Sequence, residues 1–175
     1  MNETYKVQVQ GLVDDLKAVF THAGLGGEAG EYKLLTQSFL YKFLNDKFLY
    51  QAKVLDESNT YENLLAMSEE DYDWLLEDIG TSTAWLKPDQ LIETLHRQQN
   101  EATFYETFEN TLNQIAIDNN DIFSVHTDGD TAIRLFDERL ITDTISDSSK
   151  RNEVAKAIIN LLARVKFDET IFSQG

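Results

Sequence analysis

The sequence contains no cysteine, one proline and eight glycines among its 175 residues. Without cysteine the chain has no disulfide, no thiolate metal ligand and no thiol nucleophile. The low proline and glycine content excludes collagen-like and low-complexity classes. No apolar run approaches the roughly 20 residues that a membrane-spanning helix needs, and residues 1–6 lack the pattern of a secretion signal. We therefore expect a soluble, cytoplasmic protein that does not bind membranes.

Basic residues are also scarce, since the chain has 15 Lys and Arg but 31 Asp and Glu, which gives a net charge of −16. Residues 54–86 carry nine acidic and no basic residues, whereas residues 149–175 carry three acidic and five basic ones. Since affinity for nucleic acid comes largely from Lys and Arg, we expect the isolated chain to bind DNA weakly or not at all. The acidic middle is interpreted as a solvated surface, with an acidic patch that docks a basic partner or imitates DNA as the alternative.

Hydrophobic residues, 42% of the chain, recur at three- and four-residue steps and predict helices over most of its length. The first helix is expected from about Tyr5 to Ala23, followed by a glycine-rich loop. From Glu31 to about Lys53 nearly the whole circumference of a helix would be apolar, which places this helix at the centre of a bundle. Its narrow polar strip consists of Ser38, Lys42, Asn45 and Asp46.

Capping residues and the proline predict the shorter helices. The expected N-caps are Asn59 (with Glu62), Ser68 (with Asp71) and Ser149, Gly80 is expected at a helix end, and Pro88 at a first helical position. Residues 118–148 are the least regular, with a turn at residues 128–130 and at most a minor strand or turn element around residues 118–140. The predicted fold is all-α: an irregular bundle of about seven helices in a single domain, residues 1–175.

No motif in the chain predicts a reaction centre. Residues 24–29 match the loose G-x-G-x-x-A dinucleotide pattern, but a helical pattern precedes them where that motif requires a strand, so they are interpreted as a helix–helix loop. Glu93 and His96 have the Glu-x-x-His spacing of a di-iron bundle, but such a site needs two of these pairs and the chain has one. His96 is therefore expected on the surface near a helix end. The other histidines, His22 and His126, are scattered. We therefore predict that the chain has no catalytic, cofactor-binding or metal-binding residues.

Two segments nevertheless resemble a known family. Glu31-Tyr32-Lys33 and the sequence FLYKFLNDKF at residues 39–48 resemble the N-terminal helical domain of type I restriction–modification methyltransferase (M) subunits. Residues 149–168 are similar to the helix that leads toward the catalytic domain in that family, and residues 167–168 and 171–172 to the short bridge before it. The resemblance extends from about residue 10 to residue 175.

The resemblance implies a parent enzyme that transfers a methyl group from S-adenosylmethionine to the N6 amine of a flipped adenine in DNA. Such enzymes need a glycine-rich cofactor loop and an Asn-Pro-Pro-Tyr/Phe loop. This chain has neither, because its one proline, Pro88, follows Lys87. We therefore expect no cofactor in this chain, S-adenosylmethionine in the full-length parent, and a catalytic domain after residue 175. The implied partners are DNA, the specificity subunit and a restriction subunit.

Phosphate contacts are expected from the less acidic ends of the chain. The candidate DNA-contact residues are Lys33, Lys42, Lys47, Lys150, Arg151, Lys156 and Arg164, each with a solvated helix surface as its alternative role. Two other functions stay open at this point. The chain could be a free-standing acidic protein that mimics DNA and inhibits restriction, or a helical adaptor that dimerises through apolar faces.

Overall fold

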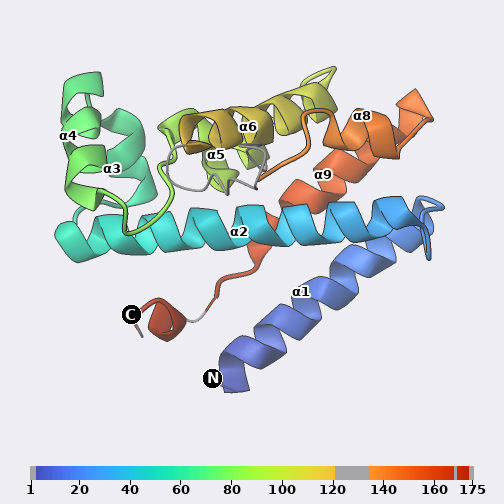
Figure 1. The fold of residues 1–175 in the computed structure, drawn as a ribbon, viewed down its shortest axis with the longest axis horizontal. Helices are drawn as coiled ribbons and strands as arrows, with labels where there is room; N and C mark the ends of the chain where they lie inside the picture. The colour runs from blue at the N-terminus through green and yellow to red at the C-terminus, as the bar shows by residue number, and fades with distance from the viewer. Residues whose placement is uncertain (1–2, 121–134, 168, 174–175) are drawn as a thin grey trace, which may run out of the picture.

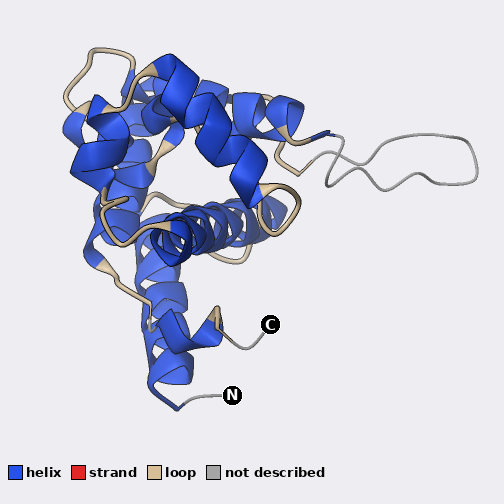
Figure 2. Cartoon of the chain, turned by 90° about the vertical axis from the view of Figure 1, so that its left-hand side faces the viewer, coloured by secondary structure: helices blue, strands red, loops and turns tan. Residues whose placement is uncertain are grey.

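The computed structural model describes residues 3–120, 135–167 and 169–173, and within them every regular element is a helix (Figure 2). The elements are α1 (Glu3–His22), α2 (Ala29–Leu55), α3 (Tyr61–Ala66), α4 (Glu69–Ile79), α5 (Ile92–Arg97), α6 (Phe104–Asp118), α8 (Leu140–Thr144) and α9 (Ser148–Arg164), with 3-10 turns η1 (Pro88–Gln90) and η2 (Glu169–Ile171). The all-α prediction is confirmed. The predicted turn at residues 128–130, most of the predicted irregular element, and His126 lie outside the described residues.

The 27-residue helix α2 runs through the middle of the molecule (Figure 1). Helix α1 lies on one side of it, α5, α6 and α8 lie on the other, and α3 and α4 stand near its C-terminal end (Figure 1). Helix α9 crosses α2 and packs against α1, α5 and α6 (Figure 1). The central position predicted for the helix over residues 31–53 is therefore correct.

The polar strip of α2 faces inward, which the sequence pattern did not indicate. Ser38, Lys42 and Asn45 are buried, whereas the apolar Phe39 and Phe43 are only partly buried. Lys42 is 4% exposed, so its alternative role on a solvated helix surface is wrong. The physical reason is that other segments of the chain supply hydrogen-bond partners for Lys42 and Asn45, at Val165 and Ile92. The buried Ser38 hydroxyl has no hydrogen-bond partner among the described residues.

The loop between α1 and α2 follows the prediction of a helix–helix connection. Gly24 and Gly27 adopt φ of +86° and +80°, a region that side chains with a Cβ rarely enter. The backbone N–H of Gly27 donates to the Glu31 carboxylate over 2.8 Å. Glu31 of the Glu-Tyr-Lys segment thus closes the loop from the first turns of α2, while Tyr32 beside it is 70% exposed.

Some of the predicted caps are correct and others are displaced by one or two residues. The Ser68 hydroxyl accepts from the N–H of Asp71 over 3.1 Å at the start of α4, Gly80 ends that helix with a φ of +60°, and Pro88 begins η1. The other two predicted caps, Asn59 and Ser149, are wrong.

At α3 the cap is Thr60, because the Asn59 amide donates to the carbonyl of Ala52 over 2.9 Å and ties down the end of α2. At α9 the cap is Asp147, whose carboxylate accepts from the backbone N–H of Ser149 over 3.0 Å.

One buried carboxylate fixes the five-residue helix α8. Glu109 on α6 is 5% exposed, and its Oε2 accepts from the N–H groups of Ile141 and Thr142, each over 3.0 Å. Its Oε1 accepts from the Thr142 hydroxyl over 2.7 Å. A helix this short is unstable alone, so Glu109 satisfies its first amides and sets its position against α6.

Candidate functional site

A groove of about 540 Å³ lies along the inward-facing side of α2. Residues from α2, the start of α3, α5, the end of α9 and the C-terminal segment (165–167, 169 and 172) line it. Its charged lining residues are four basic and four acidic ones: Lys42, Lys53, Arg97 and Lys166, and Asp46, Glu62, Glu93 and Glu169. The opposite charges balance, so this groove lacks the excess of positive charge that a phosphate channel needs.

Lys42 holds the segment that follows α9. Its ammonium group lies 3.0 Å from the Asp46 carboxylate, donates to the carbonyl of Val165, and sits 5.5 Å from the centre of the Phe167 ring. Burial lowers the pKa of Lys42, and the Asp46 carboxylate acts in the opposite direction. Because these contacts use the ammonium group fully within the protein, Lys42 is a structural residue here and is not accessible to a DNA phosphate.

Asn45 and Tyr41 hold the start of α5 and the turn before it in the same way. The Asn45 side-chain oxygen accepts from the backbone N–H of Ile92 over 2.9 Å, and its amide donates to Asp46 over 3.0 Å. The buried Tyr41 hydroxyl donates to the carbonyl of Gln90 over 2.6 Å. Burial, and secondarily the charge of Asp89, raise the pKa of Tyr41 well above its usual value. The polar side of α2 therefore binds two backbone segments that are distant in sequence.

Aromatic side chains complete the attachment of the C-terminal segment. The Phe167 ring packs against Tyr5 and Phe39 at centroid distances of 5.4 and 6.0 Å. Phe172 packs against Phe43 and Tyr50 at 5.5 and 5.7 Å. The partly buried Phe39 and Phe43 of α2 thus pack against Phe167 and Phe172 from the C-terminal segment.

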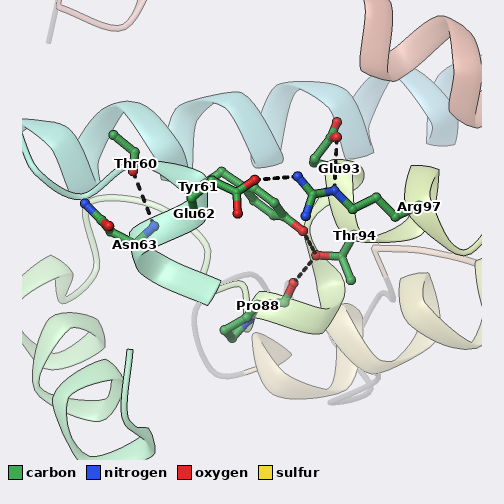
Figure 3. A network of polar contacts seen from close by, with 8 residues as sticks. All are labelled: Thr60, Tyr61, Glu62, Asn63, Pro88, Glu93, Thr94 and Arg97. Atoms are coloured by element: carbon green, nitrogen blue, oxygen red, sulfur yellow. Dashed lines mark hydrogen bonds and ion pairs between the residues drawn. The ribbon is translucent and has the colours of Figure 1, made fainter. Parts of the chain in front are cut away.

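Arg97 forms a second polar cluster at the rim of the groove, shown in Figure 3. Its guanidinium group pairs with Glu62 and, over 3.4 Å, with Glu93, and it lies 4.9 Å from the centre of the Tyr61 ring. The Tyr61 hydroxyl is 2.8 Å from the hydroxyl of Thr94. This cluster joins α3 to α5, and its cation is already paired with two carboxylates.

Besides Lys42, two of the seven predicted DNA-contact residues form salt bridges at separate places on the molecule. Lys33 and Lys47 are 14 positions apart on α2, which corresponds to about 21 Å along a helix. Lys33 pairs with Asp137 over 3.2 Å, and Arg164 with Asp15 over 3.8 Å.

Arg151 is also engaged within the protein, because it donates to the carbonyl of Ile145 over 2.8 Å and lies over the Tyr105 ring. Lys47, Lys150 and Lys156 form no salt bridge with any residue that the structure describes, and Lys150 is the exposed one of the three.

Sequence reasoning missed the other basic residues of the groove, Lys53, Arg97 and Lys166. Lys53 and Arg97 belong to no motif, and Lys166, although it lies in the family-like segment 149–168, was not singled out there. Within the described ranges no group of three or more His, Asp and Glu side chains is placed to hold a metal ion. None of the helices there is both long and apolar enough to cross a membrane.

The site and the fold define an all-α bundle whose central helix binds the backbone of two other segments through buried polar side chains. No protein-family model, curated protein or solved structure matches the chain.

Proposed function

We propose that this chain is the N-terminal helical domain of an adenine-specific DNA methyltransferase of the type I restriction–modification class, and that it does not catalyse methyl transfer by itself. In this role it holds DNA together with the rest of the complex and contacts the specificity subunit. The observation that carries the proposal is the set of internal contacts that Lys42, Asn45 and Asp46 make. Lys42 and Asn45 of the family-like segment are buried, Asp46 is partly buried, and their partners include the backbone at the start of α5 and after α9.

Burying polar and charged groups is unfavourable unless each finds a partner, and apolar residues of similar size would pack more simply. A partnered polar set specifies one arrangement of the segments that it binds. In the proposed parent, fixing residues 165–167 against α2 fixes the direction in which the chain enters the catalytic domain. That requirement explains why the polar residues occur within an otherwise apolar helix.

Not all of the seven predicted basic residues remain available to contact DNA. Lys42 and Arg151 are occupied by internal partners, whereas Lys47, Lys150 and Lys156 have no described salt bridge. Contacts of this kind would position the domain on the phosphate backbone without reading sequence. Because the net charge of the chain is −16, these lysines would act only within an assembled complex whose other parts supply most of the positive charge.

The coding sequence beyond Gly175 provides the first test. We expect a glycine-rich S-adenosylmethionine loop followed by an Asn-Pro-Pro-Tyr/Phe motif, and a stop codon or an unrelated domain would refute the proposal. The isolated chain, incubated with labelled S-adenosylmethionine and DNA, should transfer no methyl group.

A gel-shift titration of the assembled complex tests the DNA-contact role. Lys150→Glu should lower DNA affinity uniformly across sequences and change the slope of log affinity against log salt by about 1. Lys87→Glu, the same charge change at an exposed lysine next to the acidic segment, is the matched control and should have no effect. Equal effects of both variants would show that Lys150 makes no specific contact. If the wild-type chain instead displaces DNA from such a complex, the acidic-mimic alternative is correct.

A further inference from the structure

The outer face of α4 carries an exposed tryptophan. Trp74 is 60% exposed, and it lies on the opposite side of the helix from the buried residues Tyr72, Leu75, Leu76 and Ile79. The other tryptophan, Trp85, is half-buried and donates its indole N–H to the carbonyl of Gly80 over 2.7 Å. Trp74 thus contributes its large apolar surface to solvent rather than to the core.

Carboxylates surround Trp74 at every helical neighbour position. The residues three and four positions before and after it, which lie next to it on a helix surface, are Glu70, Asp71, Glu77 and Asp78. All four are exposed. None of them forms a salt bridge with a described residue.

The stability of α4 does not explain this arrangement. Carboxylates in the first turn, such as Glu70 and Asp71, are favourable near the positive end of the helix dipole. Glu77 and Asp78 stand in the last turn, where negative charge is unfavourable and where α4 has no basic residue. Asp73 and Glu77, four positions apart, also repel each other. Without a positively charged partner, the charges at this end of the helix therefore oppose its folding.

The Arg97 cluster shows how such a face is neutralised within the same chain. There a guanidinium group lies over an aromatic ring, Tyr61, with a carboxylate on either side, Glu62 and Glu93 (Figure 3). On α4 the ring and the carboxylates are present at helical spacing, and the cation is supplied by no described residue.

We propose that the outer face of α4 binds a basic segment of a partner protein, with an Arg or Lys side chain packed on the Trp74 indole and paired with the flanking carboxylates. The partner is a protein and not a nucleic acid, because the nine acidic residues at positions 54–86 are accompanied by no basic residue and repel phosphate. This interaction does not depend on the methyltransferase proposal and would hold for a free-standing protein as well.

The test uses the full chain and a fluorescein-labelled twelve-residue peptide in which arginine alternates with alanine, followed by fluorescence anisotropy at low and moderate salt. An otherwise identical peptide with citrulline, which is neutral and nearly isosteric, is the probe control. We expect the arginine peptide to bind and the citrulline peptide not to bind. Trp74→Ala should weaken binding about two- to fivefold, as expected for an exposed cation–π contact, and Trp74→Phe should weaken it less.

Charge variants separate this site from the general acidity of the chain. The pair Glu77→Gln/Asp78→Asn should weaken binding and reduce its salt dependence. The pair Glu101→Gln/Glu153→Gln removes the same charge from exposed positions on other parts of the surface and should have little effect. If both pairs weaken binding equally, if Trp74→Ala changes nothing while helical circular dichroism is retained, or if the arginine peptide does not bind at low salt, the proposal is wrong.

Discussion

The buried ion pair between Lys42 and Asp46 gives a quantitative test of how α2 holds the rest of the fold. The side chains of Lys42 and Asp46 are 5% and 16% exposed. Breaking a buried pair by removing one partner typically costs about 3–5 kcal/mol of unfolding free energy, because the other charge is left unpaired. Lys42→Met keeps the length of the side chain and removes its charge. We expect a loss near the lower end, about 3 kcal/mol, since Asp46 keeps its bond from Asn45 and some contact with water.

The double variant isolates the coupling between the two residues. Asp46→Asn alone should cost about 1.5–3 kcal/mol, as for a lost hydrogen bond to a charged group. With both charges absent, the variant Lys42→Met/Asp46→Asn should be more stable than the sum of the single losses by about 1–3 kcal/mol. Urea unfolding followed by helical circular dichroism measures all four proteins. Losses that add within about 0.5 kcal/mol would refute the view that the pair acts as one buried unit.

Three further predictions concern single groups. Burial raises the pKa of Tyr72 and Tyr41, so these phenols ionise more readily in the unfolded chain than in the folded one. The free energy of unfolding should therefore fall as pH rises above about 10. Tyr72→Phe should make this fall with pH less steep in urea unfolding at alkaline pH. Asp147→Ala removes the cap of α9 and should lower the midpoint of thermal unfolding, and Ser149→Ala, at the position wrongly expected to cap α9, should lower it by less. Glu109→Gln should cost about 1.5–3 kcal/mol, and faster hydrogen exchange of the α8 amides would locate the damage.

The sequence was sufficient for the helical class, the central helix and the glycine loop, because these follow from local periodicity and from glycine conformations. It was insufficient to predict which side of α2 is buried. Lys42 and Asn45 find partners 123 and 47 positions away, at Val165 and Ile92. As long as those partners are unknown, a buried polar strip cannot be distinguished from one that faces solvent.

The candidate site was predicted less well than the fold for a related reason. Seven basic residues were chosen by their segment charge, yet Lys42 is buried and the guanidinium group of Arg151 is engaged by backbone carbonyls. Local competition displaced the cap at α3 as well, since the Asn59 amide is engaged by the end of α2 and Thr60 replaces it. In each case the deciding interaction joins two elements, and helical periodicity describes only one.

The contact between the first helix and the segment after α9 has a mechanical consequence. Tyr5 packs on Phe167, and the Gln8 amide donates to the carbonyl of Lys166 over 2.6 Å, so the two ends of the described chain lie together on one side of the molecule (Figures 1 and 2). A force that pulls the ends apart loads the contacts of Phe172 with α2 and then this contact. Under optical-tweezers extension, residues 165–172 should therefore detach in an early step, before the helices around α2 separate.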